Sequence, residues 1–565
     1  MNLFSEFPSI TYQQWLAQIE KDLKGKPLSA LNWKWAEGIE TSPFPDKNEV
    51  NTPSFGFPLR RGNVFNITDS GWQFVQEICL DNVAAAIEIV NSVQHTDIQG
   101  FRLFTRQADI PILELYDVLR SIDLRRFAVH IHLPLMEEDT LYGIINLLME
   151  NGYETHVLTG ALYVGVAANM SEPFWVEKDP TYFSAFQTLG VDLMQYENNM
   201  VHQLAFALGI SVEMVEYLKG EKVSSEKSFA SFAYHFPVGG DFFPEIAKFR
   251  AFRMLFAKLA GAYQISDETA LSPFVMASTS SNNKAAYDAY TNLLRSTTEA
   301  ISAIIGGANA INVRPFDATF SDSNAFSQRI ARNIQHLLKY ESYLDKVSDA
   351  GGGSFYIEKL TEQIAQAAWK LFQEIETKGG FSACWKSGFI QEMQATTQRK
   401  ALIDMRKRKK VLIGVNQYPD TKAVIQALKY TNPTFYGQEY EEIRQKIAEF
   451  VKARGKAVIA QIHAFGDLTM RNARALFVRN VLGCAGFEVV ENAENQPDVI
   501  VLCSSDAEYF EEGKNIIASF REKYPQTGIF IAGKPENMEI LGTDGNLYAG
   551  MDVVYFLQQT VAAIF

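Results

Sequence analysis

The strongest constraint on the fold is a repeat in which short apolar runs alternate with helical patterns between residues 70 and 345. The eight runs begin near Phe74, Gln99, Phe127, His156, Val191, Phe229, Phe274 and Ala310. The helical patterns between them include residues 82–93, 112–122, 140–151, 201–219 and 243–263. Apolar strands that alternate with helices are typical of parallel sheets buried on both faces. Eight such units over about 280 residues predict a closed (β/α)8 barrel.

One unit is especially clear and occupies residues 286–317. Its apolar positions recur at helical spacing, at Tyr287, Tyr290, Leu294, Ile301, Ile304 and Ile305. Gly306 and Gly307 follow, and glycine readily adopts the left-handed conformation that ends a helix. Residues 310–313 then predict a short strand, which Pro315 closes.

The pattern changes to a compact α/β unit after about residue 455. Strands are predicted at residues 458–462, 487–490, 499–503 and 528–532, and helices at 473–482 and 507–521. Short parallel strands with helices between them favour a flavodoxin-like fold. We therefore divide the chain into an N-terminal arm (1–60), a barrel (61–375), a linker (376–450) and this α/β domain (451–565).

The arm and the linker carry signals of their own. The arm has one short amphipathic helix, whose apolar face holds Tyr12, Trp15, Ile19 and Leu23. Trp33 and Trp35 follow outside any repeat, so the arm must pack on something else; its own barrel and a partner subunit are the two alternatives. In the linker, the basic run at residues 406–410 indicates a solvated or acid-paired helix end.

Composition narrows the class of protein. The 565 residues carry a net charge of −14, which argues against nucleic acid as the main partner. The four cysteines form no CxxC pair and predict reduced thiols in a cytoplasmic protein; they are Cys79, Cys384, Cys484 and Cys503. The first residues lack the features of a signal peptide, and no stretch reaches about 18 apolar residues, so we expect neither secretion nor a membrane span.

Several segments resemble the methylmalonyl-CoA mutase family. They are the unit at residues 286–317, the segment Gly-Asp-Phe-Phe-Pro-Glu-Ile-Ala-Lys-Phe-Arg at residues 240–250, and the segment Gly-Val-Asn-Gln-Tyr-Pro at residues 414–419. The resemblance extends from Phe7 to the C-terminus. It implies a (β/α)8 barrel followed by a cobalamin-binding domain of the flavodoxin type. The family's reaction interconverts (R)-methylmalonyl-CoA and succinyl-CoA with adenosylcobalamin.

The cobalamin loop that this resemblance implies is incomplete. The family places Asp-x-His-x-x-Gly after the first strand of the domain; its histidine ligates cobalt, and its aspartate orients the histidine. Here Asp467 or Arg471 stands at the ligand position. His463 and Gly466 keep the His-x-x-Gly spacing, but Gln461 replaces the aspartate. Because His463 also falls early, at the strand end, we expect it to be a hydrogen-bonded residue and not a cobalt ligand.

Other positions also lack the residues that the family uses for the cofactor or for catalysis. Lys534 stands where cobalamin domains have the second glycine of a Gly-Gly pair, and its side chain would crowd the cofactor's nucleotide tail. The catalytic chain has a Tyr-His pair at the end of its fifth barrel strand. Residues 191–196 instead read Val-Asp-Leu-Met-Gln-Tyr, so no catalytic residue carries over.

The histidines of the barrel were considered as metal ligands. His130 and His132 lie two apart and therefore share one face of a strand. No carboxylate or cysteine lies at ligand spacing beside them, so packing is favoured over a metal site, as it is for His235 on the sixth strand. The sequence therefore predicts no catalytic, cofactor-binding or metal-binding residue in this chain.

These departures are similar to those of the family's small (β) subunit, whose ending the segment 550–554 also resembles. The implied role is structural: a heterodimer with a large (α) subunit, which holds adenosylcobalamin and the active site. No nucleic acid or membrane partner is expected. Two alternatives remain open, a catalytically complete acyl-CoA mutase with an atypical cobalamin loop and a non-enzymatic assembly partner of another acyl-CoA mutase.

Overall fold

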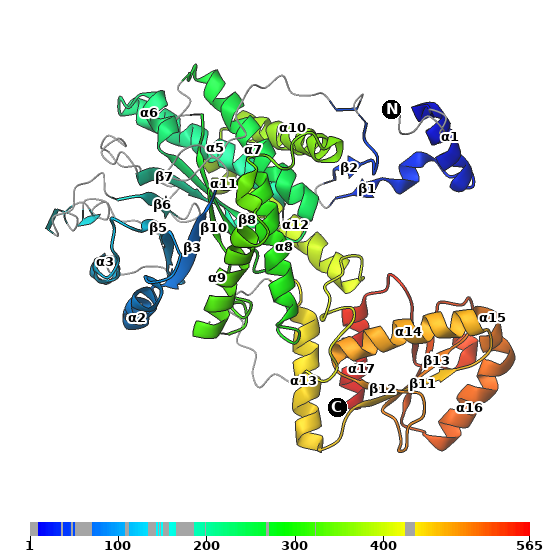
Figure 1. Ribbon diagram of the computed structural model, residues 1–565. Coiled ribbons are helices and arrows are strands. Elements are labelled where there is room, and N and C mark those ends of the chain that lie inside the picture. Colours follow the sequence, from blue (N-terminus) through cyan, green and yellow to red (C-terminus); the bar gives the residue numbers. More distant parts are fainter. Residues whose placement is uncertain are drawn as a thin grey trace, which may run out of the picture.

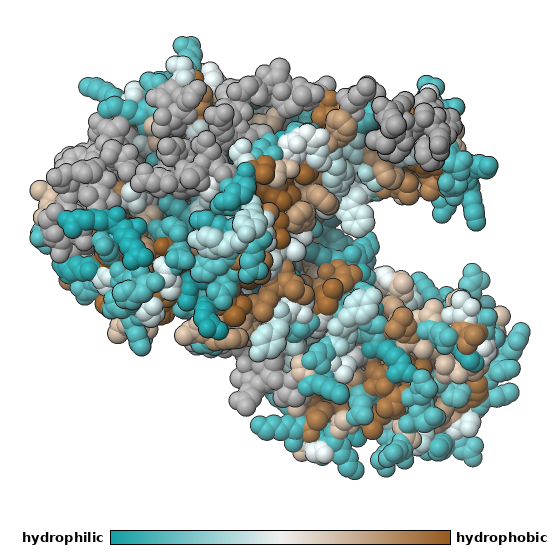
Figure 2. Space-filling view, viewed as in Figure 1, coloured by the Kyte–Doolittle hydropathy of each residue, from teal (hydrophilic) through white to brown (hydrophobic). Residues whose placement is uncertain are grey.

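The structure is a computed structural model with a barrel, a smaller α/β domain and an N-terminal arm (Figure 1). It describes residues 10–35, 38–46, 49–50, 71–107, 112–133, 143–144, 146, 149–150, 158–164, 186–197, 199–266, 271–321, 324–423 and 435–565. The arm and the α/β domain extend from the barrel on the same side, and an opening separates them (Figure 2).

Eight parallel strands close into a barrel, which confirms the fold predicted from the repeat. The strands are β3 (Gln73–Cys79), β4 (Gly100–Phe104), β5 (Ala128–Leu133), β6 (Gly160–Val164), β7 (Phe186–Asp192), β8 (Phe232–Val238), β9 (Phe274–Thr279) and β10 (Ala310–Asn312). They pair in the order β10-β3-β4-β5-β6-β7-β8-β9. The barrel closes where Ala310 of β10 pairs with Gln73 of β3.

Helices cover the outside of the barrel. They are α2 (Val83–Val93), α3 (Ile112–Arg120), α5 (Met200–Gly220), α6 (Ser225–Ala230), α7 (Phe242–Ala262), α8 (Thr291–Gly306), α9 (Ala325–Tyr340) and α10 (Phe355–Thr377), with the short turns η4 (Met194–Tyr196) and η5 (Leu344–Lys346). Asn82 caps α2 by accepting a hydrogen bond from the Ala85 N–H, as asparagine commonly does. Gly307 ends α8 with a φ of 89°, as the Gly-Gly pair predicted.

Some element boundaries differ from those predicted. β7 begins at Phe186, five residues before Val191. β6 begins at Gly160, whereas His156, where that strand was expected, lies outside the described residues. The predicted helix at 140–151 also lies largely outside them.

The helix predicted from residue 286 begins only at Thr291. Tyr287 lies before it, and Leu294 is 69% exposed, so the proposed apolar stripe is wrong over its first half. The cause is tertiary. The Asn292 side chain bonds both the N–H and the carbonyl of Ala285, and Glu441 accepts a hydrogen bond from the Ala286 N–H. These bonds hold the segment in a loop.

The barrel lumen is filled with side chains. One buried cluster consists of residues from five strands that face inward: Val75, Ala161, Tyr163, Ala233, Phe274, Met276 and Ala310. His130 joins them, because its ring stacks on Phe274 at a centroid distance of 5.3 Å. The interior is therefore a packed core and not an open channel.

The N-terminal arm has an anchored part and a projecting part. It contains α1 (Tyr12–Asp22), η1 (Leu28–Leu31) and the antiparallel strands β1 (Trp33–Lys34) and β2 (Glu40–Thr41). The Thr41 hydroxyl donates to Gln363 of α10 at 3.0 Å, and Gln363 donates to the Glu40 carbonyl at 3.0 Å. No residue of α1 is buried, and this helix stands away from the barrel (Figure 1).

The predicted linker is largely helical, with α11 (Phe381–Lys386), α12 (Phe389–Arg406) and α13 (Gln438–Arg454). The basic run at residues 406–410 begins at the last residue of α12, where Arg406 pairs with Glu439 and, at 3.7 Å, with Asp552. Lys410 lies over the Tyr436 ring at 4.0 Å. This part of the run is therefore an acid-paired helix end, as expected.

The α/β domain has one five-stranded parallel sheet. Its strands are β11 (Ile459–Ala464), β12 (Glu488–Val490), β13 (Val499–Cys503), β14 (Gly528–Ala532) and β15 (Gly545–Leu547), in the order β12-β11-β13-β14-β15. The helices are α14 (Leu468–Ala485), α15 (Asp506–Glu508), η6 (Tyr509–Gly513), α16 (Lys514–Lys523), η7 (Met538–Leu541) and α17 (Val553–Ile564). This order, 2-1-3-4-5 within the domain, is compatible with the flavodoxin-like arrangement.

Candidate functional site

A cavity of about 550 Å³ lies at the carboxyl end of the barrel, where barrel enzymes place their sites. Strand ends supply its charged floor, and α12 crosses above with Gln394 and Gln398. Four ionisable side chains of the strands and the loops that follow them line it: Glu77, Arg102, Glu197 and Arg314.

Glu77 is the centre of the charged floor. Its Oε2 accepts a hydrogen bond from Arg102 Nη1 at 2.8 Å, and Arg314 Nε lies 3.6 Å from the same oxygen. Asn312 Nδ2 donates to it at 3.0 Å. Burial alone would raise the pKa of Glu77, but the two arginines outweigh burial and hold it below its usual value. Glu77 is therefore ionised.

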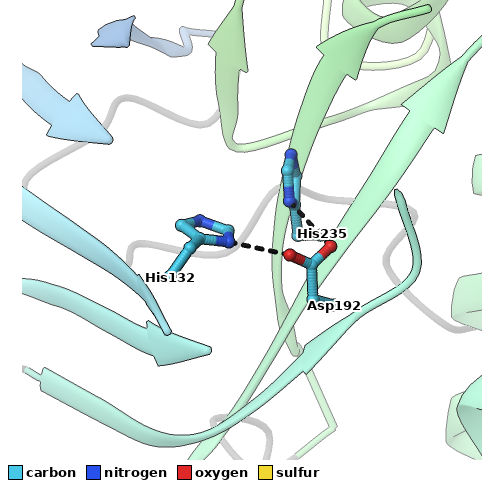
Figure 3. Close-up of side chains that lie close together, drawn as sticks. All are labelled: His132, Asp192 and His235. Carbon is cyan, nitrogen blue, oxygen red and sulfur yellow. Dashed lines mark hydrogen bonds and ion pairs between the residues drawn. The ribbon is translucent and has the colours of Figure 1, made fainter. Parts of the chain in front are cut away.

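A second cluster lies in the lumen, where Asp192 at the end of β7 stands between two histidines (Figure 3). His132 Nδ1 is 2.9 Å from Asp192 Oδ2, and His235 Nδ1 is 3.1 Å from Oδ1. Burial lowers the pKa of both histidines in spite of this carboxylate. Burial opposes ionisation of Asp192, yet His235 and the hydrogen bonds hold its pKa well below the usual value.

These pKa directions fix the proton positions. Each neutral histidine donates its Nδ1–H to the ionised Asp192. His235 Nε2 then accepts from the Ser278 hydroxyl at 2.7 Å, and the hydroxyl oxygen accepts from Asn312 Nδ2 at 3.1 Å. The chain of hydrogen bonds therefore links the lumen cluster to Glu77. Two acceptor atoms of this network, His132 Nε2 and Asn312 Oδ1, are buried and have no partner among the described residues.

The His132, Asp192 and His235 cluster has the composition of a metal site. One ligand atom of each residue lies within 4.8 Å of the others. Two features oppose a bound cation: both Nδ1 atoms are used as donors to the carboxylate, and Arg102 is close enough to lower the pKa of His132. The arrangement is better suited to holding the half-buried Asp192 carboxylate in place.

The sequence missed this cluster because its members are far apart in the chain. His132 and Asp192 are 60 residues apart, and His235 follows Asp192 by 43. The expectation that no carboxylate lies beside the histidines of β5 is therefore wrong for His132. His130 Nε2 is 3.4 Å from the Gln73 amide oxygen. Only the position of Asp192 at a strand end could have suggested the contact.

In the α/β domain, the residues considered for cobalt ligation have other roles. Asp467 caps α14 by accepting a hydrogen bond from the Met470 N–H at 2.8 Å. Arg471 Nη1 lies 3.5 Å from the Gly466 carbonyl. His463 lies within β11, and its ring packs edge-on against Phe520 of α16 at 5.3 Å. The expected side-chain hydrogen bond of His463 is replaced by this aromatic contact.

The crevice at the carboxyl ends of β11 and β13 is filled. Ligands of parallel sheets bind where the strand order reverses, which in this sheet is between these two strands. Glu508 occupies the position: its carboxylate accepts from the Asp467 N–H at 2.8 Å and from the Ser504 hydroxyl at 2.6 Å. A Cβ at Gly466 would lie 2.2 Å from the Glu508 carboxyl carbon. The two loops are thus joined by one side chain.

Arg474 closes the next gap, between β13 and β14. Its Nη1 donates to the Ser504 carbonyl at 2.5 Å, and its Nη2 to Asp506 at 2.7 Å. The guanidinium lies against Gly533, because a Cβ at Gly533 would be 2.7 Å from Nη1. Lys534 does not enter the crevice; its ammonium lies over the Tyr548 ring at 5.1 Å. The described residues therefore offer no fit for cobalamin with a histidine ligand.

Comparison with known proteins gives one consistent result. The family described as methylmalonyl-CoA mutase matches residues 175–486. A methylmalonyl-CoA mutase small subunit from Porphyromonas gingivalis is 30% identical over 597 residues, covering 96% of this chain and 95% of that protein. The small subunit from Streptomyces virginiae is 27% identical over 611 residues, with coverage of 99% and 98%.

A shorter match is to a methylmalonyl-CoA mutase from Rhizobium meliloti, 30% identical over 246 residues, which covers 43% of this chain and 34% of that protein. Within the described part of the chain, no helix has the length and apolar character needed to cross a membrane.

Proposed function

The chain belongs to the methylmalonyl-CoA mutase family and is similar over nearly its whole length to small subunits, and from this premise we propose that it is the structural small (β) subunit of a heterodimeric mutase. The holoenzyme would interconvert (R)-methylmalonyl-CoA and succinyl-CoA. Adenosylcobalamin and the active site would reside on the large (α) subunit. This chain would contribute a barrel and a flavodoxin-like domain that support the large subunit but perform no chemistry.

The filled crevice of the α/β domain is the observation that carries this proposal. A cofactor at the switch point between β11 and β13 would have to displace the Glu508 carboxylate from the Asp467 N–H and the Ser504 hydroxyl. It would also have to displace Arg474 from Gly533. Each of these charged groups would lose short hydrogen bonds, and bonds to charged groups are stronger than bonds between neutral groups. These contacts support the proposal that this domain works without a cofactor.

The barrel supports the same proposal. The resemblance to the family places a substrate-guiding histidine at the end of the fifth strand, where this chain has Asp192 between two neutral histidines. The lumen beyond it is packed with Tyr163, Phe274 and Met276. Propionate metabolism in the cytoplasm is the setting we propose; all four cysteines are free, which suits a reducing compartment.

The exposed arm supports a protein partner. Ile10 and Trp33 are 71% and 62% exposed, and Phe44 is 45% exposed. Hydrophobic side chains also lie along the opening between the arm and the α/β domain (Figure 2). A large exposed apolar surface of this kind usually marks an interface. We propose that the large subunit covers it.

Titration with adenosylcobalamin tests the cofactor part of the proposal. The purified chain should leave the visible spectrum of the cofactor unchanged, and His463→Ala should behave in the same way. The large subunit, titrated under the same conditions, is the positive control. A base-off spectrum with a histidine ligand that is lost in His463→Ala would favour the catalytically complete mutase instead.

An activity assay separates the structural role from catalysis. Mutase activity should require the large subunit, and Glu508→Gln in this chain should leave the kcat of the reconstituted heterodimer within about twofold. A loss of activity of the size expected for a catalytic acid or base, about 10²–10⁴-fold, would contradict a non-catalytic role for the α/β domain.

A further inference from the structure

We propose that the cavity at the barrel mouth binds a carboxylic acid with a hydroxylated body, held by Arg102 and Arg314. This ligand site is additional to the structural role proposed above. It would give the small subunit a binding activity of its own, independent of cobalamin and of the large subunit's reaction.

The guanidinium groups of Arg102 and Arg314 have more N–H donors than there are acceptors beside them. Both face Glu77, but only Arg102 Nη1 bonds it directly, at 2.8 Å. Arg314 Nε stays 3.6 Å from the carboxylate. The buried Nε atoms of both arginines have no hydrogen-bond partner among the residues that the structure describes. Two guanidinium groups thus share one carboxylate and retain donors beside the cavity that they line. A second planar carboxylate satisfies such donors in the fork geometry that guanidinium groups favour.

The Arg102 side chain and the Arg314 backbone are held in place before any ligand arrives. The Arg102 guanidinium lies over the Phe104 ring at 4.6 Å, and its exposed fraction is only 9%. The Arg314 N–H donates to the Thr279 hydroxyl at 2.9 Å, which fixes its backbone beside β9. Ligand binding to the ordered Arg102 guanidinium therefore loses little side-chain entropy.

The rest of the lining favours a hydroxylated ligand body. α12 presents Gln394, Thr397 and Gln398 across from the strand ends, where Ser281 and Asn282 also line the cavity. Amides and hydroxyls of this kind both donate and accept hydrogen bonds. The packed lumen prevents a ligand from passing deeper into the barrel.

Charge favours a single carboxylate over a phosphate. The cavity lining contains two arginines and two glutamates, Glu77 and Glu197. Glu197 is held by the Ser280 hydroxyl at 2.7 Å and the Asn282 N–H at 3.3 Å. A dianionic phosphate would bring two further negative charges beside this fixed carboxylate, whereas a monocarboxylate brings one.

Isothermal titration calorimetry of the full-length chain tests the proposal, with gluconate as the probe. Sorbitol, which has the same hydroxylated body without the carboxylate, is the neutral control, and glucose 6-phosphate is the phosphate control. We expect gluconate to bind with a millimolar or lower Kd. Sorbitol should show no binding, and glucose 6-phosphate should bind at least tenfold more weakly than gluconate.

Two variants test whether gluconate binds in this cavity. Arg314→Gln should weaken gluconate binding at least tenfold and still fold, because Glu77 keeps its bonds from Arg102 and Asn312. Arg120→Gln, on the exposed surface of α3, is the matched control and should bind as the wild type does. Absence of gluconate binding, equal binding of sorbitol, tighter binding of the phosphate, or undiminished binding by Arg314→Gln would each overturn the proposal.

Discussion

His130, His132 and His235 lie inside the barrel, and burial lowers the pKa of each. For His132 and His235, Asp192 opposes this effect but does not reverse it. His130 has no such carboxylate; its ring stacks on Phe274 and its pKa falls to about 3. These buried neutral histidines therefore link the stability of the barrel to pH.

The substitution His130→Phe tests this link. Below pH 6.5 the unfolded chain binds a proton at residue 130. The folded chain binds a proton there only below about pH 3. Stability is therefore lost as the pH falls from 6.5, by about 1.4 kcal/mol per pH unit from this residue. In His130→Phe, the free energy of unfolding should fall less steeply by that amount between pH 6 and 4. Urea unfolding at several pH values measures the slope, and identical slopes for variant and wild type would contradict the assignment.

At the scale of elements, the sequence predicted most of the barrel because each βα unit carries its own pattern. The runs near Phe74, Phe274 and Ala310 coincide with strands. Asn82 begins α2 and Gly307 ends α8, as expected. The boundary that was predicted wrongly depends on contacts between residues far apart in the chain. The loop before α8 is set by Glu441, which is about 150 residues away, so helical periodicity could not reveal it.

The cluster of His132, Asp192 and His235 could not be predicted from the sequence for the same reason. Asp192 and His132 come from different strands, and only the closed barrel brings them within 2.9 Å. The filling of the cobalamin crevice was also missed in its details. The sequence predicted that the ligand histidine is absent, but not that Glu508 and Arg474 occupy the space.

The N-terminal arm gives a prediction at the same scale. Deleting residues 1–27 removes α1, which has no buried residue, and leaves the hairpin that Gln363 holds. The melting temperature of the isolated chain should therefore change by no more than about 1 °C. Association with the large subunit should weaken at least tenfold, because obligate interfaces often bury more than about 2,000 Å². Size-exclusion chromatography after co-expression measures the pairing.

Two tryptophans provide the matched control. Trp33 is 62% exposed, whereas Trp35, on the other side of Lys34, packs against the barrel core. Trp33→Ala should weaken pairing without lowering the melting temperature, and Trp35→Ala should lower the melting temperature. Undiminished pairing by both the truncated chain and Trp33→Ala would refute a role for the arm in the interface.

For the whole molecule, the contact between barrel and α/β domain depends on α13. Glu441 is buried and accepts hydrogen bonds from the N–H groups of Ala286, at 2.7 Å, and Tyr287, at 3.4 Å. Arg444 lies one turn further along α13, over the Tyr287 ring at 4.2 Å. A single loop of the barrel is thus clamped by one face of the helix that leads into the second domain.

Glu441→Ala should therefore weaken the whole molecule. It leaves the buried Ala286 N–H without its acceptor and should reduce the free energy of unfolding by about 2 kcal/mol. Glu442→Ala is the matched control, because Glu442 is the exposed neighbour and bonds only Gln438 on the same helix. Its effect should stay below about 0.5 kcal/mol. Equal losses in the two variants, measured by urea unfolding, would show that the clamp does not stabilise the molecule.

The pairing of β10 with β3 also means that the barrel cannot close until late in synthesis. β3 emerges early from the ribosome, but its partner in β10 follows about 240 residues later. At about 5–20 residues per second, roughly 10–50 s pass before the two can meet. During that time β3 presents an open edge that can pair with other nascent chains. A cell making this protein therefore has to shield the growing chain, and we expect its yield to depend on chaperones that act during translation.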